Sequence, residues 1–162
     1  MGITLYADEI FEIAEQIERN GAAFYRKAAE RFDDLSARNR LLDLATMEDN
    51  HEKKFAEMRM EFSPGETLAT SSDPDQETTL FLRAAADGKV FDIGKDPLDV
   101  LTGEFSVRSI LKKAIELEKD SIVFYTGIRE MVPKDIDKKR VTGIINEEIG
   151  HIVDLSTQLS SL

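Results

Sequence analysis

The sequence contains no cysteine, and only two of its 162 residues are histidine. The absence of cysteine excludes disulfide bonds, thiolate nucleophiles, zinc sites with thiolate ligands and iron–sulfur clusters held by cysteine. The sequence also lacks a run of about twenty apolar residues, which is the length that a membrane-spanning helix needs. Any metal that this chain binds must therefore be held by carboxylates and imidazoles.

Positive charge is scarce as well, since 21 Lys and Arg residues stand against 32 Asp and Glu residues, for a net charge of -11. Phosphate backbones of nucleic acids and anionic membrane surfaces are poor partners for such a chain, because like charges repel. The sequence does not begin with a basic stretch followed by an apolar segment and a small-residue cleavage site. We expect a soluble, cytoplasmic protein that binds neither nucleic acid nor membrane. Its length suits one domain, residues 1–162.

Apolar residues recur at steps of three and four in four long stretches, which is the periodicity of amphipathic helices. Two stretches lie in residues 5–62 and are joined by "DDLS", a connection so short that the helices must be antiparallel neighbours. The other two lie in residues 106–162, where Ser106 can cap the first and Pro133 ends it. The sequence therefore predicts two antiparallel helix hairpins.

Residues 63–105 differ from the rest of the chain in composition. "SPGETLATSSDPD" predicts a loop, "QETTLFLRAAADG" predicts a short helix that ends at Gly88, and the remainder predicts irregular chain with one more turn. This segment is a long crossover between the second and third long helices. The predicted fold is all-α, a four-helix bundle with a short extra helix in the crossover.

The two hairpins are similar in sequence. A shift of one hundred residues aligns Ala14 with Ala114 and Phe24 with Phe124 without a gap. The same shift superposes four polar pairs: Glu18 on Glu118, Tyr25 on Tyr125, Glu48 on Glu148, and His51 on His151. "ERNGAAFY" and "EKDSIVFY" share the motif ExxxxxFY, and "EDNH" and "EIGH" share the motif ExxH. The halves resemble copies of one hairpin.

The acidic residues and histidines of these motifs lie in line with the apolar residues of their helices. The six residues are Glu18, Glu48, His51, Glu118, Glu148 and His151. An uncompensated buried carboxylate costs several kcal/mol, so four of them would offset most of a typical domain stability of about 5–15 kcal/mol. Something must neutralise these charges.

The same six side chains are expected at one level of the bundle. Glu18 lies about fifteen residues before the first hairpin turn, and Glu48 and His51 lie roughly twelve to fifteen after it, about 20 Å along the helices. Residues three apart are neighbours on a helix, so each ExxH pair can reach one metal ion. Two divalent cations would cancel four carboxylates and leave one imidazole for each cation. This ligand set suits iron or manganese better than zinc, without excluding other metals.

These residues could also have purely structural roles instead of binding metal. A single ExxH is more often an exposed helical pair than a ligand pair, but two copies that each interrupt an apolar stripe favour a metal site. Tyr25 and Tyr125 are either plain core residues or donors of hydrogen bonds to the ligand carboxylates.

This pattern resembles the rubrerythrin-like branch of the ferritin-like di-iron carboxylate superfamily. The similarity covers residues 5–62 and 106–162 and leaves the crossover unexplained. The resemblance implies a ferritin-like four-helix bundle with two iron ions, for which manganese or zinc could substitute. The roles that it implies are bridging for Glu48 and Glu148, terminal carboxylates for Glu18 and Glu118, and one imidazole on each iron for His51 and His151.

Two features depart from rubrerythrins. Their additional glutamate, three residues after the ligand of the third helix, is Ser121 here, and its repeat mate is Gly21. They also carry a cysteine-ligated, rubredoxin-type iron, which this chain cannot hold. Electrons would have to come from a separate protein such as a rubredoxin. The small residues could leave coordination space for peroxide or dioxygen, or they could simply permit close helix approach.

The resemblance implies an oxidoreductase that reduces hydrogen peroxide or dioxygen at a diferrous centre, with Glu48, Glu148, Tyr25 and Tyr125 as its catalytic residues. A ferroxidase uses the same parts. A non-catalytic bundle that binds or stores iron, or an interaction module built on residues 63–105, is the alternative from another class. Ferritin-like domains often pair, so we expect a homodimer.

Overall fold

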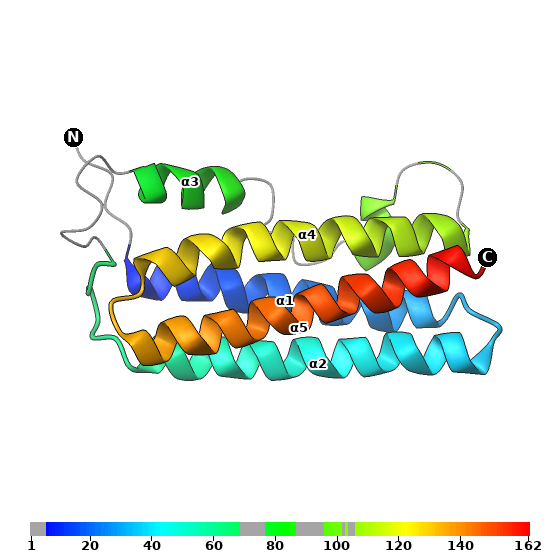
Figure 1. Ribbon diagram of the computed structural model, residues 1–162, viewed down its shortest axis with the longest axis horizontal. Coiled ribbons are helices and arrows are strands. Elements are labelled where there is room, and N and C mark those ends of the chain that lie inside the picture. The colour runs from blue at the N-terminus through cyan, green and yellow to red at the C-terminus, as the bar shows by residue number, and fades with distance from the viewer. Residues whose placement is uncertain (1–5, 69–76, 87–95, 102, 104–105) are drawn as a thin grey trace.

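The computed structural model describes residues 6–68, 77–86, 96–101, 103 and 106–162. Its four long helices are α1 (Ala7–Ala29), α2 (Leu35–Met60), α4 (Val107–Met131) and α5 (Asp135–Ser160), and the crossover contains α3 (Glu77–Ala86) and the short 3-10 helix η1 (Pro97–Val100). Figure 1 shows the four long helices running side by side along the length of the molecule. The predicted all-α bundle of two antiparallel hairpins is confirmed.

Helix ends follow the local chemistry of the sequence. The Asp34 side chain accepts a hydrogen bond from the backbone N–H of Ala37 at 2.7 Å, so it caps α2. Ser106 accepts from the backbone N–H of Ser109, and the Ser109 hydroxyl accepts in return from the backbone N–H of Ser106, both at 3.0 Å. This capping box fixes the start of α4 where the sequence predicted it.

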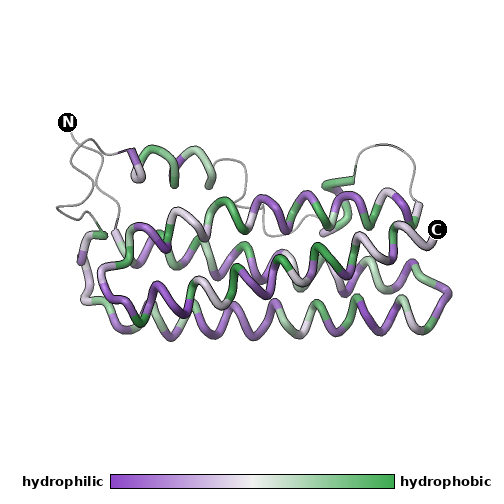
Figure 2. Tube along the Cα trace, in the orientation of Figure 1, coloured by the Kyte–Doolittle hydropathy of each residue, from purple (hydrophilic) through white to green (hydrophobic). Residues whose placement is uncertain are grey.

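The core consists of two groups of apolar side chains, one toward each end of the bundle. The first includes Phe11 and Phe55, and the second includes Phe24 and Leu111. In Figure 2, hydrophobic and hydrophilic residues alternate along the long helices, as expected for helices with one buried face. The level between the two groups is where the acidic residues and histidines of the repeat lie.

The crossover contributes to both groups. Leu82 of α3 is fully buried in the first group, and Leu98 of η1 is buried in the second. The predicted short helix and the further turn are both present, whereas the predicted helix end at Gly88 lies outside the described residues. Within the described ranges, no helix combines the length and the apolar character needed to span a bilayer.

Helix α3 packs closely against Gly127 of α4. A Cβ atom at Gly127 would lie 2.5 Å from Leu82 Cδ2 and 2.9 Å from Phe81 Cε1. We expect Gly127→Ala to lower the free energy of unfolding by about 1–3 kcal/mol, because the added methyl group overpacks this contact. Urea denaturation measures the change.

Gly143 on α5 provides the matched control, because a Cβ atom there meets nothing within 4 Å among the described residues. Gly143→Ala should raise the free energy of unfolding by about 0.5–1 kcal/mol through helix propensity. Equal effects of the two substitutions would contradict the docking of α3 at Gly127.

Candidate metal centre

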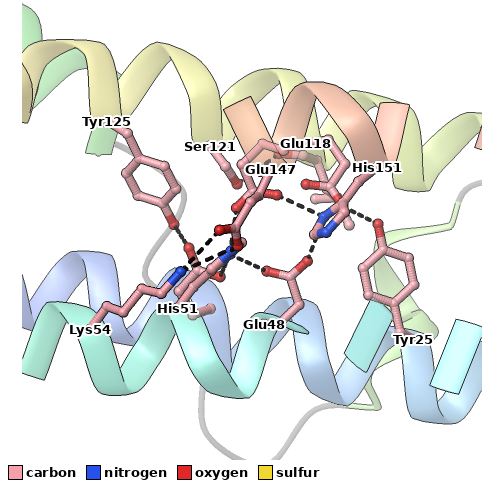
Figure 3. A network of polar contacts seen from close by, with 12 residues as sticks. Tyr25, Glu48, His51, Lys54, Glu118, Ser121, Tyr125, Glu147 and His151 are labelled. Carbon is pink, nitrogen blue, oxygen red and sulfur yellow. Dashed lines mark hydrogen bonds and ion pairs between the residues drawn. The ribbon is translucent and has the colours of Figure 1, made fainter. Parts of the chain in front are cut away.

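Six polar side chains meet between the two apolar groups of the core, and they come from all four long helices. They are Glu18 from α1, Glu48 and His51 from α2, Glu118 from α4, and Glu148 and His151 from α5. None of the six residues is more than 3% exposed. Figure 3 shows side chains of this cluster pointing toward one another across the bundle. The structure therefore brings together every residue that the sequence predicted as a metal ligand.

These side chains form two overlapping groups, each able to hold one metal ion. The first consists of Glu18, Glu48, His51 and Glu148, and the second consists of Glu48, Glu118, Glu148 and His151. Within each group, one ligand atom from every residue lies within 4.8 Å of the others. Each group thus has one imidazole and one carboxylate of its own and shares Glu48 and Glu148 with the other.

Both imidazoles turn the same ring nitrogen toward the carboxylates. His51 Nδ1 lies 3.0 Å from Glu148 Oε1 and 3.5 Å from Glu18 Oε2. His151 Nδ1 lies 2.9 Å from Glu148 Oε2 and 3.2 Å from Glu48 Oε1. The two rings are nearly parallel, with centroids 5.8 Å apart. The arrangement gives each shared carboxylate access to both histidines.

Several ligand atoms in the cluster lie near groups of opposite charge but have no partner in hydrogen-bond geometry among the described residues. They are Nδ1 of both histidines, Glu18 Oε2, Glu48 Oε1 and both carboxylate oxygens of Glu148. A buried polar atom without a hydrogen bond costs about 1–3 kcal/mol, and more when it is charged. Metal ions held by these lone pairs would remove that cost. The donor set of carboxylate oxygens and one imidazole per group therefore fits two ions of the iron or manganese type.

The charges of the cluster perturb one another strongly. Burial, together with the charges of Glu48 and Glu148, raises the pKa of Glu118, and Glu18 is affected in the same way. Burial opposes the ionisation of Glu148, yet its contacts with His151 and His51 lower its pKa to about 2. Burial also opposes protonation of His151, but its carboxylate contacts raise its pKa to about 12. The carboxylate contacts thus favour the protonated imidazole in the metal-free protein, and a metal ion that binds there would compete with the proton.

Two tyrosines connect the hairpins at the cluster. The Tyr25 hydroxyl on α1 donates to Glu118 Oε1 on α4, and the Tyr125 hydroxyl on α4 donates to Glu18 Oε1 on α1. Both tyrosines are buried, at 2% and 0% exposure. The bond from Tyr125 leaves Glu18 Oε2 to lie 3.5 Å from His51 Nδ1, whereas Glu118 Oε1, which accepts from Tyr25, itself lies 3.3 Å from His151 Nδ1.

Comparison with solved structures adds one relationship to this geometry. A crystal structure of a candidate ferritin-like diiron-carboxylate protein from Thermotoga maritima matches with a TM-score of 0.72 and covers 99% of this chain and 98% of that chain. The chain has a ferritin-like fold. The two sequences are 22% identical, so the likeness concerns the fold alone. No family model matches the sequence, and no curated protein is significantly similar to it.

Gly21 and Ser121, the two small residues that occupy matching positions in the repeat, have different surroundings. A Cβ atom at Gly21 would lie 3.4 Å from Glu48 Cγ, an ordinary van der Waals contact, so Gly21 lies against the shared carboxylate without being required for its approach. The Ser121 hydroxyl donates to the carbonyl oxygen of Leu117 at 3.0 Å, within its own helix. Gly21 therefore borders a ligand directly, whereas the hydroxyl of Ser121 is engaged by the backbone.

One contact to the cluster was not predicted from the sequence. Glu147 Oε2 lies 2.6 Å from His51 Nε2, and Lys54 Nζ lies 3.1 Å from Glu147 Oε1. The repeat gives no signal for it, because the residue one hundred positions earlier is Met47. One feature of the sequence could have indicated this contact: Glu147 directly precedes the ligand Glu148. Consecutive residues on a helix project about 100° apart, so Glu147 can face the neighbouring helix α2 while Glu148 faces the centre of the bundle.

Repulsion within the cluster leads to a prediction about stability. Because the pKa of Glu118 is raised, its ionised form is disfavoured in the metal-free protein, and Glu118→Gln keeps a neutral side chain that still accepts from Tyr25. We expect this variant to raise the free energy of unfolding of the metal-free protein by about 0.5–2 kcal/mol. It should also lose much of the increase in melting temperature that Mn(II) gives the wild type, since metal binding stabilises the native state.

Thermal and urea denaturation with and without Mn(II) measure both effects. Glu116→Gln is the control, because Glu116 is an exposed residue on the same helix that pairs with Lys113. This control should retain the response to Mn(II). Destabilisation of the metal-free protein by Glu118→Gln would contradict the assigned electrostatics.

Proposed function

We propose that this ferritin-like bundle is a di-iron oxidoreductase of the rubrerythrin-like kind, which reduces hydrogen peroxide or dioxygen. The observation that carries the proposal is the pair of buried ligand groups that share Glu48 and Glu148. The described neighbour in Thermotoga maritima, a candidate diiron-carboxylate protein of the same fold, supports the choice of two irons. When bound, two iron ions would supply the two-electron redox chemistry that the side chains themselves lack.

The residues of the chain divide the work of holding such ions. Glu18 and His51 would hold one ion, Glu118 and His151 would hold the other, and Glu48 and Glu148 reach both. The shared carboxylates keep the two positions together. Tyr25 and Tyr125 restrain the two terminal carboxylates by hydrogen bonds from the opposite hairpin.

The cluster is shielded from bulk solvent, as suits a redox centre. Apolar side chains pack at both ends of it, and its six residues are almost completely buried. Electrons are supplied by a separate donor protein such as a rubredoxin, because a chain without cysteine cannot hold a rubredoxin-type iron. A homodimer is part of the same proposal.

Stopped-flow spectroscopy tests the function. Anaerobically iron-loaded protein is mixed with hydrogen peroxide and, in parallel, with air-saturated buffer, and both reactions are then repeated with an external reductant. Faster oxidation by peroxide together with repeated turnover supports a peroxidase. A preference for dioxygen indicates an oxidase or ferroxidase, and a single oxidation without turnover indicates an iron-binding bundle. Failure to load two irons per chain would contradict the proposal.

The shared carboxylates give a prediction about metal content. Glu48→Ala or Glu148→Ala should each leave fewer than two metal ions per chain, because each substitution removes a ligand from both groups. Elemental analysis after gel filtration measures the content. Asp43→Ala, at an exposed position of α2, should retain the wild-type content. Two metal ions per chain in both glutamate variants would rule out the shared role.

A further inference from the structure

The two ligand groups have matching inner residues but different outer contacts. Each imidazole directs Nδ1 toward the carboxylates of its own group. The opposite ring nitrogen, Nε2, has a partner in His51 and none in His151 among the residues that the structure describes. The difference between the two positions therefore lies outside the ligands themselves.

On the His51 side, three residues form a chain of polar contacts across α2 and α5. His51 Nε2 lies 2.6 Å from Glu147 Oε2, and Lys54 Nζ lies 3.1 Å and 3.3 Å from the two oxygens of Glu147. The Glu147 side chain is 39% exposed, while that of His51 is fully buried. Figure 3 labels these three residues and marks the contacts among them with dashed lines.

A carboxylate beside Nε2 has two effects on a histidine ligand. It accepts the Nε2 proton, which leaves the Nδ1 lone pair free to face a metal ion and fixes the orientation of the ring. It also increases the basicity of the imidazole, which strengthens the bond to a metal ion. Lys54 holds Glu147 in place, so the carboxylate is restrained before a metal ion arrives.

The corresponding residues on the His151 side cannot act in this way. The repeat mates of Glu147 and Lys54 are Met47 and Asp154. A thioether sulfur is only a weak acceptor, and it carries no charge that would increase the basicity of an imidazole. Asp154, which stands where the other half has Lys54, is an anion and cannot hold a carboxylate in place as the lysine does. The two halves of the repeat thus have the same ligands but differ in this support.

We propose that the two metal positions are inequivalent, and that the position of His51, supported by Glu147 and Lys54, binds its ion first and more tightly. The position of His151 fills second and releases its ion more readily. Glu147 is a positioning residue, since it acts on the metal through His51. This inference rests on the proposed di-metal function, and it predicts an order of occupancy that the shared ligands alone would not produce.

Titration of the metal-free protein with Mn(II) tests the proposal, with unbound Mn(II) measured by its electron paramagnetic resonance signal. The wild type should bind two ions in two separable steps. Glu147→Ala should weaken the tighter step by about 10–100-fold, which is the usual effect of losing such a contact, and leave the weaker step unchanged. Met47→Glu should strengthen the weaker step, because it places a carboxylate at the matching position of the other half.

Glu57→Ala is the matched control. Glu57 is exposed and lines the same surface depression as Glu147 and Lys54, so its removal deletes the same charge from the same region. This variant should titrate like the wild type. Denaturation by urea shows whether each variant remains folded. If Glu147→Ala does not fold, the titration of Met47→Glu still tests the proposal.

The outcomes separate the inference from the function on which it rests. A wild type that fails to bind two Mn(II) ions would overturn the metal centre itself. Two ions bound with equal affinity, an unchanged tight step in Glu147→Ala, or an equal loss in Glu57→Ala would overturn the inequivalence and leave the metal centre intact.

Discussion

The burial of four carboxylates at one level of a helix bundle is the constraint on which the rest of this structure depends. Glu48 and Glu148 are deeply buried and favour the ionised form, while the pKa values of Glu18 and Glu118 are raised. If all four carboxylates were ionised, two protonated imidazoles would offset only half of their charge. A domain keeps such a cluster against a cost of several kcal/mol per buried ion when a ligand compensates for it. Two divalent cations match it in charge and in donor atoms.

The internal repeat explains how the cluster is built. One hairpin supplies half of a site, and the second copy completes it because the two face each other across the bundle. The hydrogen bonds of Tyr25 and Tyr125 both cross from one hairpin to the other, so the outer contacts of the carboxylates also depend on the pairing. The halves differ where one has Met47 and the other has Glu147. Neither residue is a metal ligand, so this difference alters the affinity of one metal position without removing it.

The sequence predicted the parts of the fold that depend on local signals. Capping by Ser106, the "DDLS" turn and the apolar periodicity each act within a few residues, and the repeat identified six residues that the structure brings together. Contacts set by the rotation of one helix against another could not be predicted. The sequence left open whether Tyr25 would donate to a ligand carboxylate, and it did not indicate that Glu147 would reach His51 or that α3 would dock at Gly127. These depend on packing between distant segments.

The most direct test of the metal centre is anomalous diffraction from a crystal of the protein grown with Mn(II) or, anaerobically, with Fe(II). The account predicts two anomalous peaks within the bundle, one beside His51 and one beside His151, with Glu48 and Glu148 in contact with both. A single peak, peaks only on the surface, or a cluster without bound metal at saturating concentration would contradict it.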